Sequence, residues 1–190
     1  FFDYSLQYGD YDKRLKARAY YWKGECLYRT QKIDAAKAEY EKFINAFGAA
    51  ELDEFTIAHY NLGYCCFNSK KYSEARKWFV KYVGLYNTVD KRLISDAYNR
   101  LGDCMYVQRD FKPAIEFYDN ALKTSAAVGD YSMLQKGICL GLTKDNRGKI
   151  DQLKKLIQDY PQSPYCDNAY YEIARTHVAL DEIKDAIYNF

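Results

Sequence analysis

A chain of 190 residues of which 48% are hydrophobic has enough apolar material for a packed core, which excludes a disordered segment. The 28 Lys and Arg side chains nearly balance the 26 Asp and Glu side chains, and no block of five like charges occurs. We therefore expect neither nucleic acid nor an anionic membrane surface as a partner. No run approaches the roughly 18 apolar residues that cross a bilayer, so we expect no direct membrane insertion of this segment.

Three segments of the chain align with one another and predict a repeated helical hairpin. Gly24, Gly63 and Gly102 are separated by 39 residues each time, and a further step of 39 reaches Gly141. After each of the first three glycines, a cysteine follows at two residues, an aromatic ring at four, an alanine at twelve and another ring at sixteen. The residues near the glycine predict one helix, and the later ones predict its antiparallel partner after a short polar turn.

The glycines have a physical role in this pattern, because a side chain at a close helix crossing would push the two backbones apart. One hairpin alone leaves its apolar face exposed, and stacked neighbours bury it, so we expect an array with local contacts. Both ends of the chain fall within a second helix, which predicts a piece of a longer array. We predict repeats at approximately residues 17–50, 56–88, 95–127, 134–163 and 167–190, with residues 1–10 as the end of a preceding repeat.

The fourth repeat departs from the pattern. It has Gly137 where an aromatic ring is expected, and Leu153 in place of the alanine. The fifth repeat fits again, with Ala174 at the glycine position and a ring at Phe190. The repeat pattern therefore does not define the packing of the fourth repeat.

The segments NLGYCCF…YSEARKWF and RLGDCMY…FKPAIEFY resemble the tetratricopeptide repeat (TPR) family. The resemblance implies an all-α fold, in which helical hairpins stack into a right-handed superhelical solenoid. It also implies a non-enzymatic scaffold that binds a protein or a peptide, without a cofactor. Because the family unit has about 34 residues, steps of 39 predict longer loops or an extra helical turn between repeats.

Residues 156–174 (LIQDYPQSPYCDNAYYEIA) resemble the junction between repeats in TolA-binding periplasmic proteins and outer-membrane assembly lipoproteins of bacteria. Pro161 and Pro164 are expected to end one helix, and Ser163 can cap the next. This resemblance implies a bacterial protein of the periplasm or outer membrane that takes part in cell-envelope assembly.

The cysteines favour a cytoplasmic protein instead. Cys26, Cys65 and Cys104 stand at equivalent positions on the first helices of successive repeats, about 8–10 Å apart, which is too far for disulfides. We predict buried free thiols, which are unusual in an oxidising compartment. The six cysteines include no C-x-x-C pair, and His59 and His177 are far apart, so we predict no metal site and no catalytic residue.

In the TPR family the first helices line a concave groove, and the residues three before, one after and four after the glycine point into it. Here this stripe combines rings with polar groups, which suits an extended peptide or a helix, because Tyr buries a large area at low entropy cost. Asn61 and Arg100 match part of the carboxylate clamp of chaperone-binding relatives, whereas Tyr21, Glu25 and Asp96 do not. The candidate partner-binding residues are Tyr21, Glu25, Tyr28, Tyr60, Asn61, Tyr64, Phe67, Asn99, Arg100, Asp103 and Tyr106.

Other interpretations of these residues stay open. Several of the rings can simply pack between repeats, above all Tyr28, Phe67 and Tyr106. The segment can also be a structural spacer in a long repeat array, or the regulatory arm of an enzyme encoded elsewhere in the gene. A spacer predicts that substitutions in the groove leave every partner interaction intact.

Overall fold

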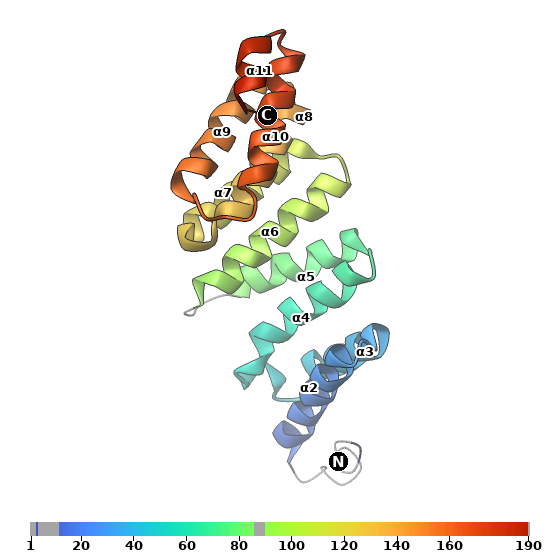
Figure 1. The fold of residues 1–190 in the computed structure, drawn as a ribbon. Helices are drawn as coiled ribbons and strands as arrows, with labels where there is room; N and C mark the ends of the chain where they lie inside the picture. Colours follow the sequence, from blue (N-terminus) through green and yellow to red (C-terminus); the bar gives the residue numbers. More distant parts are fainter. Residues whose placement is uncertain (1–2, 4–11, 86–89, 190) are drawn as a thin grey trace. The chain divides into compact units, whose positions relative to one another are not determined.

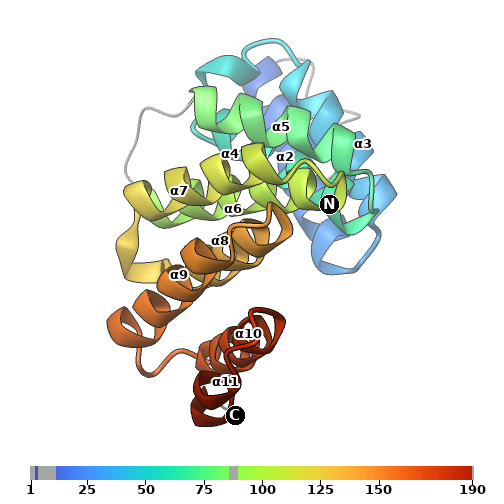
Figure 2. The same ribbon diagram turned by 90° about the horizontal axis from the view of Figure 1, so that it is seen from above.

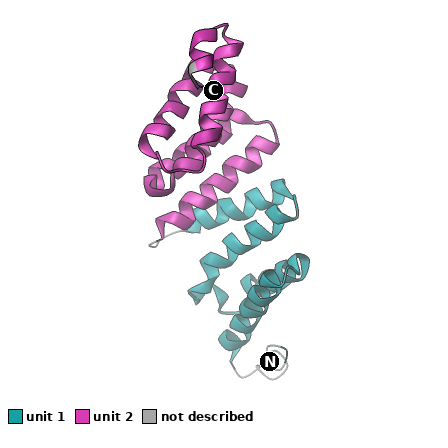
Figure 3. Cartoon of the chain, in the orientation of Figure 1, with its two compact units in different colours: residues 1–88 teal, residues 89–190 magenta. Residues whose placement is uncertain are grey.

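The computed structural model describes residue 3 and residues 12–85 and 90–189, and the described residues form helices and no strand. The prediction of an all-α fold is confirmed. The chain divides into two compact units, residues 1–88 and residues 89–190 (Figure 3). Within the described residues, no helix is both long enough and apolar enough to cross a membrane. The predicted end of a preceding repeat at residues 1–10 lies, apart from Asp3, outside the described residues.

Residues 12–85 of the first unit form two helical hairpins (Figure 1). Helix α2 (Lys13–Arg29) pairs with α3 (Ile33–Ile44), and α4 (Glu54–Asn68) pairs with α5 (Tyr72–Leu85). Helix α3 also packs against α4, so the two hairpins share one core. A short 3-10 turn, η2 (Ala49–Glu51), lies in the connection between them.

The second unit contains three hairpins of the same kind. Its elements are α6 (Lys91–Val107), α7 (Phe111–Thr124), the 3-10 turn η3 (Ala126–Val128), α8 (Asp130–Leu142), α9 (Asn146–Asp159), α10 (Cys166–Ala179) and α11 (Ile183–Asn189). Helix α6 pairs with α7, α8 with α9 and α10 with α11. In Figure 2, α6 runs alongside α7, and α8 runs alongside α9. Consecutive hairpins meet where α7 packs on α8 and where α9 packs on α10.

In the first three hairpins, a glycine on the first helix faces a ring sixteen residues later on the second helix. A Cβ atom added at these glycines would lie 2.9, 2.7 and 2.5 Å from the nearest ring atom, closer than a carbon contact allows. The three rings are fully buried. The helices can therefore pack at this distance only because the first helix has no side chain there. The pairs are Gly24 with Tyr40, Gly63 with Phe79, and Gly102 with Tyr118.

The fourth hairpin keeps this crossing at Gly137 and not at Gly141. A Cβ at Gly137 would lie 2.7 Å from Cδ2 of Leu153, which is fully buried on α9 sixteen residues later. The step from Gly102 is therefore 35 residues, and the prediction that the step of 39 continues to Gly141 is wrong. Leu153 replaces the ring and not the alanine. The crossing sets the spacing inside a hairpin, whereas the loop between hairpins is free to change its length.

The turns inside the hairpins follow the same corrected spacing. Seven residues after each glycine, or after Ala174 in the fifth hairpin, a residue other than glycine has a positive φ angle. A single left-handed residue of this kind ends a helix by directing its backbone N–H back to the last carbonyls. These residues are Gln31, Lys70, Arg109, Lys144 and Asp181, with φ angles of 61°, 58°, 61°, 68° and 62°.

All six cysteines are free thiols. Cys65 and Cys104 are buried as predicted, but Cys26 is exposed, so the prediction of three buried thiols is wrong for this residue. Cys65 packs against the preceding hairpin, in one core cluster with Ala17 and Tyr40. Cys26 lies on the first helix of the described chain, where no described hairpin covers the equivalent position.

The proline-containing junction ends α9 as predicted, because α9 stops at Asp159, before Pro161. Ser163 does not cap α10, whose N-cap residue is Tyr165. Instead, the Ser163 hydroxyl accepts a hydrogen bond from the backbone N–H of Tyr165 at 3.2 Å and donates one to Asp130 at 2.7 Å. Ser163 therefore ties the junction to the beginning of α8.

The glycine crossing predicts opposite effects for two substitutions. Gly102→Ala brings a Cβ against the buried Tyr118 ring, and we expect it to lower the free energy of unfolding by about 1–3 kcal/mol. Gly84→Ala, on α5, meets no atom within 4 Å, and we expect no loss and a gain of up to about 1 kcal/mol. Urea unfolding followed by circular dichroism measures both. Equal effects of the two substitutions would contradict the crossing.

Candidate functional site

In the first unit, a hydrogen-bond network joins both first helices to α3. Glu25 on α2 accepts from the hydroxyl of Tyr40 and from the amide of Asn61 on α4, both at 2.6 Å. The Asn61 amide also lies 3.5 Å from the hydroxyl of Tyr21, which is only 6% exposed. Burial, together with the nearby Glu25 carboxylate, raises the pKa of Tyr21 to about 12. Three of the predicted partner-binding residues thus hold α4 against the first hairpin.

A row of half-buried aromatic rings follows α4, and we call Tyr60, Tyr64 and Phe67 the α4 ring row. The ring centroids of Tyr60 and Tyr64 are 4.9 Å apart, and those of Tyr64 and Phe67 are 6.4 Å apart. Rings of α5 support the row, because Tyr64 lies 5.4 Å from Phe79 and Phe67 lies 5.4 Å from Tyr72. These edge-to-face contacts are the favourable geometry for aromatic pairs, so the surface is ordered before any partner arrives.

Tyr28 lies on α2, beside the end of the α4 ring row. It is half-buried, and its hydroxyl accepts a hydrogen bond from the side-chain amide of Asn68 at 2.9 Å. Asn68 directly follows Phe67, the last ring of the row. The predicted residues Tyr28, Tyr60, Tyr64 and Phe67 therefore form the half-buried aromatic part of the candidate site in the first unit.

In the second unit, Asp103 has the position that Glu25 has in the first. One of its carboxylate oxygens accepts from the hydroxyls of Tyr118 and Tyr131, both at 2.8 Å. Its other oxygen lies 2.7 Å from a guanidinium nitrogen of Arg100, which also stands over the Tyr131 ring. Asp103 is only 8% exposed. This carboxylate and Arg100 connect α6 to α7 and α8.

The two other predicted residues of this unit lie differently from each other. Asn99 is 5% exposed, and its side-chain oxygen accepts a hydrogen bond from Ser132 on α8 at 2.7 Å. Tyr106 is half-buried, and its ring centroid lies 5.8 Å from that of Phe111. Asn99 therefore acts within the core, whereas Tyr106 faces a hollow of the surface.

The residue that follows each crossing glycine changes together with the large residue fifteen positions later. A carboxylate stands opposite a tyrosine, a ring opposite a phenylalanine, and an aliphatic side chain opposite a leucine. The buried hydroxyl of a tyrosine needs an acceptor, and the other two side chains do not. The pairs are Glu25 with Tyr40, Asp103 with Tyr118, Tyr64 with Phe79, and Ile138 with Leu153.

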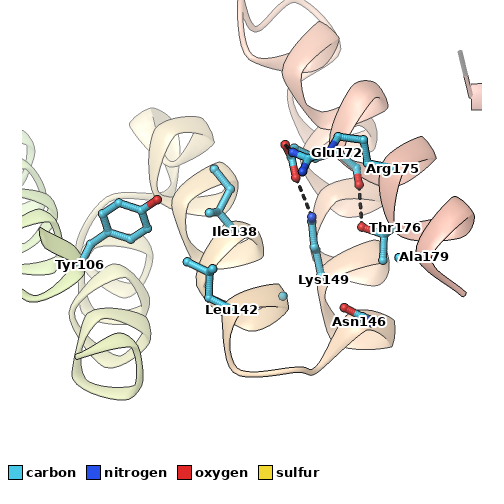
Figure 4. A pocket seen from close by; sticks show the side chains of 10 residues that line it. Tyr106, Ile138, Leu142, Asn146, Lys149, Glu172, Arg175, Thr176 and Ala179 are labelled. Atoms are coloured by element: carbon cyan, nitrogen blue, oxygen red, sulfur yellow. Dashed lines mark hydrogen bonds and ion pairs between the residues drawn. The ribbon is translucent and has the colours of Figure 1, made fainter. Parts of the chain in front are cut away.

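A hollow of about 440 Å³ lies in the second unit, among α6, α8, α9 and α10 (Figure 4). Apolar side chains from α6 and α8 form one side of it, and charged side chains from α9 and α10 form the other. We call it the Lys149 hollow, and its principal lining residues are Tyr106, Ile138, Leu142, Lys149, Glu172 and Arg175.

Three of these residues form a compact charged group. The Lys149 ammonium lies 2.6 Å from one oxygen of Glu172, and Arg175 lies 2.8 Å from the other. The Lys149 side chain is 12% exposed, and the Arg175 side chain is 58% exposed. Burial acts to raise the pKa of Glu172, but the hydrogen bonds and charges of Lys149 and Arg175 outweigh it, so the pKa lies below its ordinary value.

Of the residues that line the Lys149 hollow, sequence reasoning identified only Tyr106. The predicted partner-binding residues all belong to the first three repeats, so they do not include Ile138. Counted from Gly137, Ile138 directly follows the crossing glycine and belongs to the groove stripe. The signal that finds it is Leu153, the large residue sixteen positions after the true crossing.

Both histidines are buried. His59 is a packed core residue, with its ring 4.9 Å from Phe55 and 5.8 Å from Trp78, and burial lowers its pKa. The Nδ1 atom of His177 lies 2.7 Å from Glu182. Neither histidine is among the described residues that line the Lys149 hollow.

Among the described residues, one group could bring three metal-ligating side chains together, namely His177, Glu182 and Asp185, whose ligand atoms lie within 4.8 Å of one another. Arg147 already donates to both oxygens of Glu182. This guanidinium supplies the positive charge that the carboxylate needs, and a metal ion would have to displace it. We therefore assign no metal ion to this group.

The network around Glu25 predicts energetic coupling between two residues. Tyr40→Phe removes a hydroxyl that donates to a carboxylate, and we expect it to lower the free energy of unfolding by about 1.5–3 kcal/mol. In the Glu25→Gln background the same change should have a smaller effect, since the acceptor is no longer charged. Chemical denaturation of the two single variants and the double variant measures the coupling, and strictly additive effects would contradict it.

Comparison with known proteins agrees with this geometry. Two family models, both described as tetratricopeptide repeat, match residues 29–90 and 131–163, which together make up half of the chain. No curated protein matches the chain by sequence. The similarity of residues 156–174 to cell-envelope proteins has no counterpart in these matches and stays a prediction.

Several solved structures share the fold. YrrB, described as a TPR protein with an unusual peptide-binding site, is 21% identical, with a TM-score of 0.73 over 99% of this chain and 88% of that one. MamA from Desulfovibrio magneticus RS-1 is 16% identical, with a TM-score of 0.75 over 92% and 91%. The apo form of RapI is 11% identical, with a TM-score of 0.83 over 99% of this chain and 56% of its own. Because both family models describe this repeat and the glycine crossing recurs along the chain, the chain belongs to the tetratricopeptide repeat family.

Proposed function

We propose that this chain is a non-enzymatic scaffold that binds an extended segment of a partner protein on the exposed side of its first helices. The observation that carries the proposal is the α4 ring row. Its three rings are half-buried and held edge to face by one another and by α5. Rings that are already ordered lose little conformational entropy on binding, and aromatic residues are the most frequent anchors of protein interfaces.

The predicted site residues divide into two groups under this proposal. The half-buried rings contact the partner, and the residues of the hydrogen-bond networks around Glu25, Asn99 and Asp103 position the helices that carry those rings. The proposed contact residues are Tyr28, Tyr60, Tyr64, Phe67 and Tyr106, and the positioning residues are Tyr21, Glu25, Asn61, Asn99, Arg100 and Asp103.

The chemistry of the buried groups supports a scaffold over an enzyme. Burial raises the pKa of the thiols of Cys65, Cys66 and Cys139 to about 12, so these cysteines are protonated near neutral pH and are poor nucleophiles. Burial lowers the pKa of His59, and its Nδ1 atom lies 2.9 Å from the backbone oxygen of Phe55. Each of these groups serves packing.

The likeness to YrrB supports a peptide as the partner, because the two chains share their fold and YrrB is described with a peptide-binding site. A role in bacterial cell-envelope assembly is a further hypothesis, and it rests only on the likeness of residues 156–174 to junctions in such proteins.

The proposal predicts that loss of the ring row abolishes peptide binding. Random dodecapeptides displayed on phage are selected for binding to residues 1–190. The selected peptides are then synthesised, and their affinities are measured by fluorescence anisotropy. We expect Tyr64→Ala or Phe67→Ala to weaken binding at least about tenfold, because each removes an aromatic anchor. Phe47→Ala is the matched control, since Phe47 is 76% exposed but lies outside the first helices.

A circular-dichroism melt establishes that each variant is folded. If no peptide is enriched, or if the ring-row variants bind as tightly as the control, the interpretation as a structural spacer is favoured and the proposal is wrong.

A further inference from the structure

At two positions, the fourth hairpin differs in residue size from the first three. It has a small residue where they have a large one, and a large residue where they have a small one. Four residues after its crossing glycine it has Gly141, and twelve residues after it has Lys149. The first three hairpins have an aromatic ring at the first of these positions and a fully buried alanine at the second. The corresponding residues are Tyr28, Phe67 and Tyr106 for the ring, and Ala36, Ala75 and Ala114 for the alanine.

The two exchanged residues contact each other. A Cβ atom at Gly141 would lie 2.7 Å from Cδ of Lys149, so the aliphatic part of the lysine passes over α8 where a side chain is missing. In Figure 4 the lysine extends from α9 toward Glu172 on α10, and the hydrogen bond between them is 2.6 Å long. The exchange thus leaves Gly141 where the other hairpins have a ring, and it places the Lys149 ammonium beside the space that the missing ring leaves.

The charged group beside this space carries an excess of one positive charge. Lys149 and Arg175 are cations, and Glu172, which pairs with both of them, is the one carboxylate among the described residues that line the hollow. An ammonium has three N–H donors and a guanidinium has five, so both cations keep donors beyond those directed at Glu172. An added carboxylate would balance the excess charge, and the low exposure of Lys149 makes such a pair stronger than one at an open surface.

We propose that the Lys149 hollow binds an Asp or Glu side chain of a partner peptide, with an adjacent apolar side chain of the peptide over Ile138 and Leu142. This inference rests on the proposed function, because the ligand is a peptide. The volume of about 440 Å³ admits two side chains, and the lining offers an apolar side and a cationic side for them. The lysine stands on a second helix, at a position that the other hairpins fill with alanine, so the site is a feature of this chain's fourth hairpin.

The first test is a selection of random dodecapeptides, fused through their C-termini so that acidic side chains are the carboxylates offered. We expect residues 1–190 to enrich peptides with Asp or Glu beside an apolar residue, and the Lys149→Met variant to lose this preference. Replacing that acidic residue by Gln or Asn in a synthetic peptide should weaken binding to the native chain about tenfold and leave binding to Lys149→Met unchanged. A second library with free C-termini separates side-chain carboxylates from terminal ones, and an acidic preference seen only there would overturn the assignment.

The second test uses a change of opposite sign. Glu172→Gln removes the carboxylate that competes for both cations, so we expect an acidic peptide to bind severalfold more tightly. Gly141→Ala keeps every charge but displaces the lysine stem, so we expect it to weaken binding as Lys149→Met does. If Glu172 served only to hold α9 and α10 together, Glu172→Gln would weaken binding or leave it unchanged, and the proposal would be wrong.

Lys154→Met on the exposed side of α9 is the matched control, since it removes the same charge outside the hollow. Circular-dichroism melts establish that the variants fold. Peptides that depend on Tyr64 and Phe67 but ignore Lys149 would overturn this inference and leave the scaffold proposal standing. A selection that enriches no peptide would overturn both.

Discussion

The contact between a glycine and a large buried side chain sixteen residues later determines the geometry of the first four hairpins. It brings two helices close enough for their apolar faces to interlock, which requires that one of them lacks a side chain at the crossing. The other spacings follow from it, because the left-handed turn residue comes seven positions after the glycine and the second helix begins nine positions after it. Consecutive hairpins then pack on one another through α3 and α4, α7 and α8, and α9 and α10.

This contact also explains how far the fold could be predicted from the sequence. In the first three hairpins the glycine and its ring recur with a cysteine and an alanine between them, so the alignment identifies both helices of each pair. In the fourth hairpin Leu153 replaces the ring and Lys149 replaces the alanine, and a constant step then selects Gly141 as the crossing. The error arises because the loops between hairpins do not have a fixed length, whereas the distance from glycine to large residue does.

The sequence predicts which residues belong to the stripe, but it does not predict the contacts that each of them makes. Groove positions counted from the glycine included the rings of α4, which the structure leaves half-buried. The same rule selected Glu25 and Asp103, whose carboxylates are occupied by tyrosine hydroxyls from the second helix of their own hairpins. The sequence contains a signal for these hydrogen bonds, because a carboxylate directly after the crossing glycine occurs together with a tyrosine fifteen residues later. The burial of Tyr21 and Asn99 depends on side chains of the neighbouring hairpin, which the pattern of one repeat does not contain.

A fixed crossing leaves the positions around it free to differ between hairpins, and the fourth hairpin shows how such a difference can alter a surface without opening the core. Gly141 and Lys149 reverse the usual order of large and small residues at two contacting positions, so the space between the helices stays filled by the aliphatic stem. The charged end of that stem finds a carboxylate on the next hairpin, which avoids an unpaired buried charge. Packing therefore tolerates the exchange, and what changes is the chemistry offered to a partner. In a repeat protein whose hairpins share one mode of closure, such paired departures are where we expect specificity to reside.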